Sequence, residues 1–60
     1  SGFISYNDQT YYVDKNGIMK TGWIKSSGSW YYLNNNGTLA QDQWIDNYYV
    51  DSTGKMTKIQ

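Results

Sequence analysis

The chain has 60 residues, enough for one small domain or a piece of a larger one, and it contains neither cysteine nor histidine, so a disulfide or a zinc-type site cannot stabilise it. Five lysines balance five aspartates and arginine is absent, which argues against nucleic-acid binding through a basic patch. No apolar run approaches the ~20 residues of a membrane span, and these 60 residues contain no signal-peptide pattern. We expect no membrane span, no metal and no cofactor.

The first predicted element is a β-hairpin in residues 3–13. A two-residue turn at Asn7-Asp8 would place Ile4 opposite Tyr11 and Phe3 opposite Tyr12. Asparagine and aspartate tolerate the positive φ that such turns require. A polar loop with a glycine follows, and then Met19.

Residues 22–39 repeat this pattern at an offset of twenty, with Ser27-Gly28 in the turn and with Trp23 and Trp30 on one face. The third copy, from Trp44, is four residues shorter around its Asp46-Asn47 turn, which keeps its side chains on the same faces. The same pairing register follows independently in every copy. The sequence therefore predicts three hairpins and no helix.

The loops after the hairpins predict how the copies stack. Each loop contains a glycine, followed two residues later by a large apolar residue that we expect to plug the space between consecutive hairpins; these residues are Met19, Leu39 and Met56. The face that carries Ile24, Tyr31 and Leu33 recurs in every copy and is the predicted core face. A lone hairpin is marginal in water, so each needs its neighbour. We predict an all-β solenoid of hairpins joined by Gly-containing loops, a single module over 1–60 with repeats at approximately 2–21, 22–41 and 42–60, and expect it to be a fragment of a longer protein.

The segment G-W-I-K-S-S-G-S-W-Y-Y-L-N-N-N-G-T-L, residues 22–39, resembles the cell-wall-binding repeat of the choline-binding family of bacterial surface proteins. Glucan-binding repeats and the receptor-binding repeats of large toxins share this skeleton. The resemblance implies ligand sites at the joints between hairpins, each an aromatic cage formed by two tryptophans of one hairpin and an aromatic residue of the next. Carried over by position, it implies ligand contacts from Trp23, Trp30, Leu39 and Tyr49. Tyr49 is chosen over Tyr48 because it shares a face with Trp44.

The resemblance implies a non-catalytic attachment module of a secreted, cell-wall-associated protein, with choline-bearing teichoic acid as its partner. Quaternary ammonium groups suit aromatic walls because they donate no strong hydrogen bond. Glucan or a host glycan on the same tryptophans is an alternative, and a structural or oligomerising repeat without ligand is another. Exposed hairpin edges would also allow two copies of the chain to pair as a homodimer. Catalysis is not expected, because the aspartates occupy separate turns and have no reason to converge on a sugar.

Overall fold

The computed structural model describes residues 2–60, and within this range all regular structure is antiparallel β-strand. No helix there is long and apolar enough to cross a membrane. The strands are β1 (Gly2–Tyr6), β2 (Gln9–Val13), β3 (Gly22–Ser26), β4 (Ser29–Leu33), β5 (Gln43–Ile45), β6 (Tyr48–Val50) and β7 (Met56–Ile59).

The predicted hairpins and their registers are confirmed. Ile4 pairs with Tyr11 in β1–β2, Trp23 pairs with Tyr32 in β3–β4, and the third hairpin, β5–β6, repeats the same pattern. The turns have the expected backbone: Asn7 and Asp8 have φ of 51° and 66°, and Ser27 has φ of 51°. The choice of turn residues therefore fixes the register of each hairpin.

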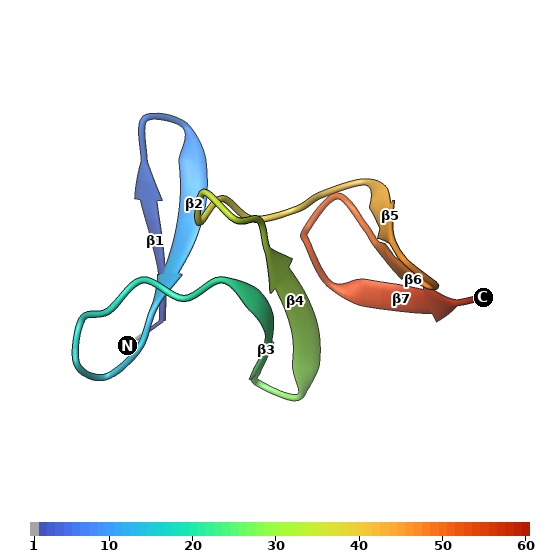
Figure 1. Cartoon of the computed structure of the whole chain (residues 1–60), viewed down its shortest axis with the longest axis horizontal. Helices are drawn as coiled ribbons and strands as arrows, with labels where there is room; N and C mark the ends of the chain where they lie inside the picture. Colours follow the sequence, from blue (N-terminus) through green and yellow to red (C-terminus); the bar gives the residue numbers. More distant parts are fainter. Residues whose placement is uncertain (1) are drawn as a thin grey trace.

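The three hairpins follow one another along the longest axis of the molecule, and each is rotated relative to the one before it (Figure 1). They form separate sheets of two, two and three strands, so the solenoid is held together by side chains and loop contacts between hairpins. The backbone also contributes at the joints, since the Leu39 N–H donates to the Thr10 carbonyl oxygen and Tyr31 bridges to Lys55.

Strand β7 was not predicted. In the first two repeats the chain turns away after its plug residue, at Gly22 and Asp42, which have φ of 80° and 53°. Residues 57–59 include no residue with positive φ, and two of them, Thr57 and Ile59, are β-branched and favour strands. The chain therefore continues as a strand along the free edge of β6.

Leu33, Val50 and Ala40 form the buried core, at 0%, 0% and 1% exposure. The predicted core face is therefore correct only at its end nearest the loop. Toward the turn this face is open, since Ile4 is 44% and Tyr48 39% exposed. A spiral of two-stranded hairpins is too thin to cover the whole of each hairpin, and this leaves aromatic side chains partly exposed at the joints.

The predicted plugs do connect consecutive repeats. A Cβ on Gly37 would lie 2.6 Å from the Met19 sulfur, and a Cβ on Gly54 would lie 2.7 Å from a Leu39 methyl carbon. Both glycines are buried and have positive φ, at 92° and 89°. Each plug thus packs directly against the glycine loop of the next repeat.

Candidate ligand site

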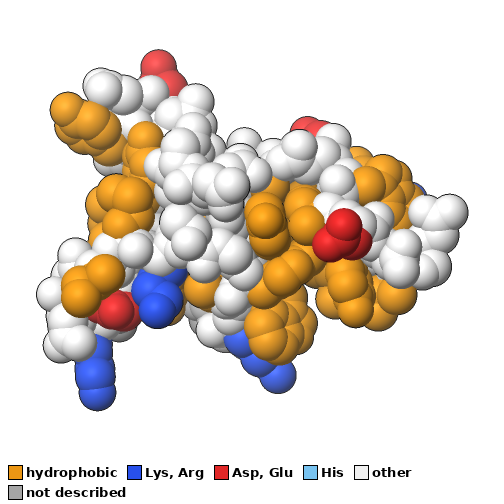
Figure 2. Space-filling view, in the orientation of Figure 1, with side chains coloured by type: hydrophobic (Ala, Val, Ile, Leu, Met, Phe, Trp, Pro, Cys, Tyr) orange, Lys and Arg blue, Asp and Glu red, His pale blue; other side chains and the backbone are white. Residues whose placement is uncertain are grey.

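The larger described cavity lies where β3–β4 meets β5–β6–β7. Its lining side chains are Trp23, Trp30, Tyr48 and Met56, and its volume is about 400 Å³. We call it the tryptophan cavity. Three of its four walls are aromatic, and in the space-filling view hydrophobic side chains extend from β3–β4 toward β6 and β7 (Figure 2).

Hairpin register and stacking place these walls. Trp23 in β3 and Trp30 in β4 share a face because strands alternate their side chains about the Trp23–Tyr32 and Lys25–Trp30 pairs. The Trp23 ring packs edge-on against Tyr32 of its own hairpin, with centroids 5.1 Å apart, and against Tyr48 of the next, at 5.5 Å. Trp30 is 42% exposed, so much of its ring remains accessible to a ligand.

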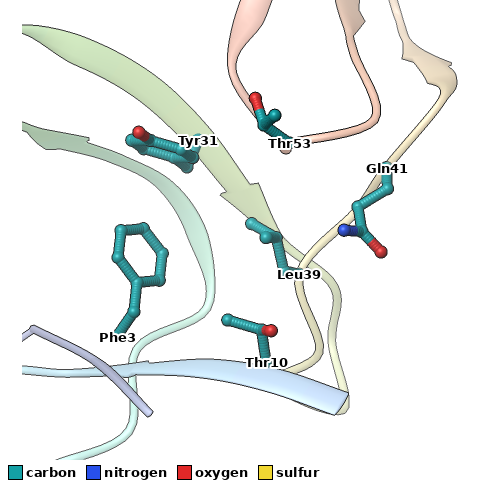
Figure 3. A pocket seen from close by; sticks show the side chains of 6 residues that line it. All are labelled: Phe3, Thr10, Tyr31, Leu39, Gln41 and Thr53. Atoms are coloured by element: carbon teal, nitrogen blue, oxygen red, sulfur yellow. The ribbon is translucent and has the colours of Figure 1, made fainter. Parts of the chain in front are cut away.

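A second cavity of about 220 Å³ occupies the preceding joint, between β1–β2 and β3–β4. We call it the phenylalanine cavity. Figure 3 shows its lining side chains around a common space, contributed by two hairpins and two loops: Phe3, Thr10, Tyr31, Leu39, Gln41 and Thr53.

The two cavities are equivalent positions of successive repeats. Phe3 corresponds to Trp23 and Thr10 to Trp30 at the offset of twenty, while Tyr31 corresponds to Tyr48 as the first tyrosine of each Tyr-Tyr pair. The Phe3–Tyr31 contact, at 4.8 Å, repeats the contact between Trp23 and Tyr48. Leu39 and Met56 correspond as plugs. Both joints therefore place side chains at the same set of repeat positions, and the residue types at those positions determine the chemistry of each cavity.

Of the four residues expected at the site, the structure brings together Trp23 and Trp30. Leu39 lines the phenylalanine cavity instead, because the plug that closes a joint follows the second of its two hairpins. Tyr49 packs against Trp44 at 5.2 Å and lies outside the tryptophan cavity. It does share a face with Trp44, as predicted, but the opposite face of the third hairpin, with Tyr48, meets Trp23.

Sequence reasoning chose Tyr49 over Tyr48 as the third wall, and it missed Met56 as a lining residue. Tyr48 and Met56 both had recognisable positions, as the first tyrosine of the third pair and as the plug of the third repeat. The missing information was which face of one hairpin contacts the next, which the hydrophobic pattern of a single hairpin does not contain.

Lys25 places a positive charge beside one wall of the tryptophan cavity. Its Nζ lies 5.9 Å from the centroid of the Trp30 ring, within the range of a cation–π contact. No carboxylate lines the cavity, and residues 2–60 contain no cluster of three or more Asp, Glu, His or Cys that could hold a metal ion. The site offers aromatic faces and a thioether, not charged ligands.

Comparison with known proteins assigns the repeat. The family model described as choline-binding repeat matches residues 1–44. The choline binding domain of Spr1274 in Streptococcus pneumoniae is 38% identical and superposes with a TM-score of 0.87 over 95% of this chain and 82% of that one. No curated protein sequence matches the chain.

Two larger proteins of Streptococcus pneumoniae also contain a similar region. Choline binding protein F, crystallised in the presence of a peptidoglycan analogue, gives a TM-score of 0.91 at 36% identity, over 97% of this chain and 20% of that one. The modular autolysin LytC gives 0.86 at 28% identity, over 92% of this chain and 14% of that one. The chain thus spans a fifth or less of these two proteins. By family model, sequence and fold, the chain belongs to the choline-binding repeat family.

Proposed function

We infer that the chain is a non-catalytic attachment module that binds a choline group of a cell-wall polymer in the tryptophan cavity. The observation that carries this proposal is the convergence of Trp23, Trp30 and Tyr48, from two hairpins, around one cavity in a choline-binding repeat. The polymer that fits this role is choline-substituted teichoic acid, and the parent protein would be secreted and held at the cell wall.

The chemistry of the walls suits a quaternary ammonium group. Such a group carries a positive charge but no N–H, so it gains most from aromatic faces, at roughly 0.5–2 kcal/mol per contact. Met56 adds a soft, polarisable surface. Three aromatic contacts correspond to binding in about the millimolar range, so firm attachment requires several such sites on one polymer.

The orientation of the rings suits a compact cation at this cavity. The Trp23 ring makes an angle of 73° with the ring of Tyr48 across the joint, so these two lining side chains form walls that are steeply tilted to each other. A trimethylammonium group is roughly spherical and contacts several tilted rings at once.

Titration with choline, followed through the indole N–H signals in nuclear magnetic resonance spectra, tests the proposal. We expect saturable shifts of Trp23 and Trp30, with a dissociation constant of about millimolar order. Trp30→Ala should abolish binding, whereas Trp44→Phe, which alters a tryptophan outside the cavity, should leave it unchanged. The neutral isostere 3,3-dimethyl-1-butanol has the same shape without the charge and should bind distinctly more weakly.

Two adjacent tyrosines give a matched pair of variants. Tyr48→Leu removes the third aromatic wall and should weaken choline binding about three- to thirtyfold, whereas Tyr49→Leu should change it little. Calorimetric titration of both variants, after thermal melting has shown that each is folded, makes the comparison. The reverse order of effects would show that the cage uses the other face of the third hairpin. Equal binding of choline by the wild type and both variants would contradict the proposed site.

A further inference from the structure

We propose that the phenylalanine cavity is a second binding site, and that its ligand is a neutral sugar ring. This inference goes beyond the proposed function, since it concerns another joint and another class of ligand. It follows from what replaces the aromatic cage at this joint and from the polar groups that the neighbouring loops supply.

The substitutions at this joint remove what a quaternary ammonium group needs. Thr10 stands where the tryptophan cavity has Trp30, so one aromatic wall is replaced by a small side chain with a hydroxyl. Leu39 replaces the methionine plug. Two aromatic residues, Phe3 and Tyr31, remain, and they meet edge to face with an interplanar angle of 68°. A cation would find fewer aromatic contacts here than in the next joint.

Polar groups take the place of the missing wall. Gln41 from the loop after β4 and Thr53 from the loop after β6 line the phenylalanine cavity, and neither position contributes to the tryptophan cavity. They lie with Thr10 around the space that Phe3 and Tyr31 face (Figure 3). The lining thus combines aromatic, amide and hydroxyl groups with no charged side chain.

Existing hydrogen bonds hold two of these polar groups in place and leave part of their capacity free. The Gln41 Nε2 donates to the Ser52 carbonyl oxygen at 3.0 Å, while its second N–H and its carbonyl oxygen have no partner among residues 2–60. The Thr53 hydroxyl donates to Asp51 Oδ1 at 2.6 Å, so its oxygen remains as an acceptor. The Thr10 side chain makes no side-chain hydrogen bond in the described range. The cavity therefore offers both donors and acceptors.

A sugar ring matches this combination. Each sugar hydroxyl both donates and accepts hydrogen bonds, which suits an amide beside two threonine oxygens, and the C–H face of the ring is apolar enough to pack on an exposed aromatic side chain. Phe3 is 39% exposed and supplies such a surface. A charged ligand would find no countercharge among the lining residues, and a fully apolar one would leave Gln41 and Thr53 without partners.

Nuclear magnetic resonance titration of the chain with N-acetylglucosamine and, separately, with glucose tests the proposal and separates an acetamido sugar from a plain one. We expect one of them to shift the Gln41 side-chain amide and the Phe3 ring signals, with a dissociation constant in about the millimolar range. Gln41→Met and Thr10→Val keep the side-chain size but lose the polar groups, and each should weaken this binding about three- to tenfold. Trp30→Ala should leave it unchanged.

Three results would overturn the proposal. The first is that choline, and not sugar, saturates the shifts of the Gln41 and Phe3 signals. The second is that sugar shifts the signals of Trp23 and Trp30 instead. The third is that neither sugar shifts any signal while the spectrum shows a folded chain. The outcome is independent of the proposed choline site, because that site is reported by the indole signals and this one by Gln41. If choline fails to bind but sugar shifts Gln41, the attachment proposal fails and this one stands.

Discussion

Lys25 lies over Trp30, a wall of the tryptophan cavity, and its effect on a cationic ligand has a definite sign. Its ammonium group lies 5.9 Å from the centre of the Trp30 ring, so a quaternary ammonium in the cavity and Lys25 would share one aromatic side chain. Two like charges about 8 Å apart repel by about 0.5 kcal/mol in a water-like dielectric, and salt reduces this further.

Lys25→Gln should therefore strengthen choline binding about twofold at low salt, and the gain should shrink at about 1 M salt. Calorimetric titration at both salt concentrations measures it. Lys15→Gln removes a lysine from the loop after β2 and serves as the control, since that residue lies outside the cavity lining. A weaker affinity in the Lys25 variant would show that the lysine supports the Trp30 wall more than it repels the ligand.

Individual residues also show how far sequence reasoning reaches at the site. The resemblance to the choline-binding repeat implied Trp23 and Trp30 as site residues, and cross-strand alternation within one hairpin placed them on one face, which depends only on register. Tyr48 was not identified, because its proximity to Trp23 depends on the rotation between hairpins. Contacts such as Met19 on Gly37 join residues of different repeats, and the recurring glycine and plug positions predict that such a contact forms but not the rotation between the hairpins.

At the level of the elements, the glycine loops offer a direct test of how repeats stack. Gly17, Gly37 and Gly54 all have positive φ, but only the last two are buried under the plug of the preceding repeat. A Cβ on Gly17 would meet nothing within 4 Å, whereas one on Gly54 would overlap three Leu39 side-chain carbons at 2.7–2.9 Å.

Gly54→Ala should therefore destabilise the fold more than Gly17→Ala. The left-handed backbone costs an alanine roughly 1–2 kcal/mol at either position, and the overlap with Leu39 adds about 1–3 kcal/mol at Gly54. For a domain whose total stability is about 3–9 kcal/mol, the Gly54 variant should be partly unfolded. Chemical denaturation compares the two variants, and equal losses would mean that the plug contact contributes nothing beyond backbone conformation.

The same loops contain carboxylates that act as local caps. Asp51 Oδ1 accepts hydrogen bonds from the Thr53 hydroxyl and from the N–H groups of Thr53 and Lys55, and the Thr53 hydroxyl is the main reason why the pKa of Asp51 lies below its usual value. In the first loop the Ile18 N–H is the main cause of the lowered pKa of Asp14. The second loop has Asn34 at this position and so carries no charge there.

A lowered pKa in the folded chain gives stability that is present above the unfolded value of about 3.9 and is lost as pH falls through the folded value. The urea midpoint should therefore be flat near neutral pH and fall below about pH 4. In Asp51→Asn the fall should be smaller, because one of the two titrating caps is gone, while the example of Asn34 indicates that the loop still forms. An unchanged pH profile in this variant would show that Asp51 does not couple protonation to folding.

The elements themselves were largely predictable. Turn residues with positive φ and symmetric shortening of the third hairpin defined every hairpin register, because each of these features acts within a few residues. Strand β7 was not predicted because Met56 occupies the position of a plug residue in its repeat. A plug residue begins a strand only when the chain after it does not turn away. The exposure of Ile4 and Tyr48 likewise depends on how little of each hairpin its neighbours cover.

For the whole molecule, the structure is one joint scheme used twice with different side chains. Both joints place an opening aromatic residue, a second position on the facing strand, a tyrosine of the next hairpin and a plug around a cavity. Because backbone contacts such as that between Leu39 N–H and the Thr10 carbonyl oxygen do not depend on these side chains, the ligand of a joint should be exchangeable without changing the fold.

The combined variant Phe3→Trp, Thr10→Trp and Leu39→Met tests this exchange. Tyr31 already occupies the position of the third wall, and Met19 against Gly37 shows that a methionine plug fits a glycine loop. The variant should gain a second choline site of about millimolar affinity, doubling the calorimetric stoichiometry, and should lose sugar-dependent shifts at Gln41. Gln9→Trp, which adds a tryptophan to β2 outside the lining, is the control and should leave the stoichiometry unchanged. If the combined variant folds but binds choline only at the original joint, the joints differ in rotation or in their loops, and the lining side chains alone do not determine the ligand.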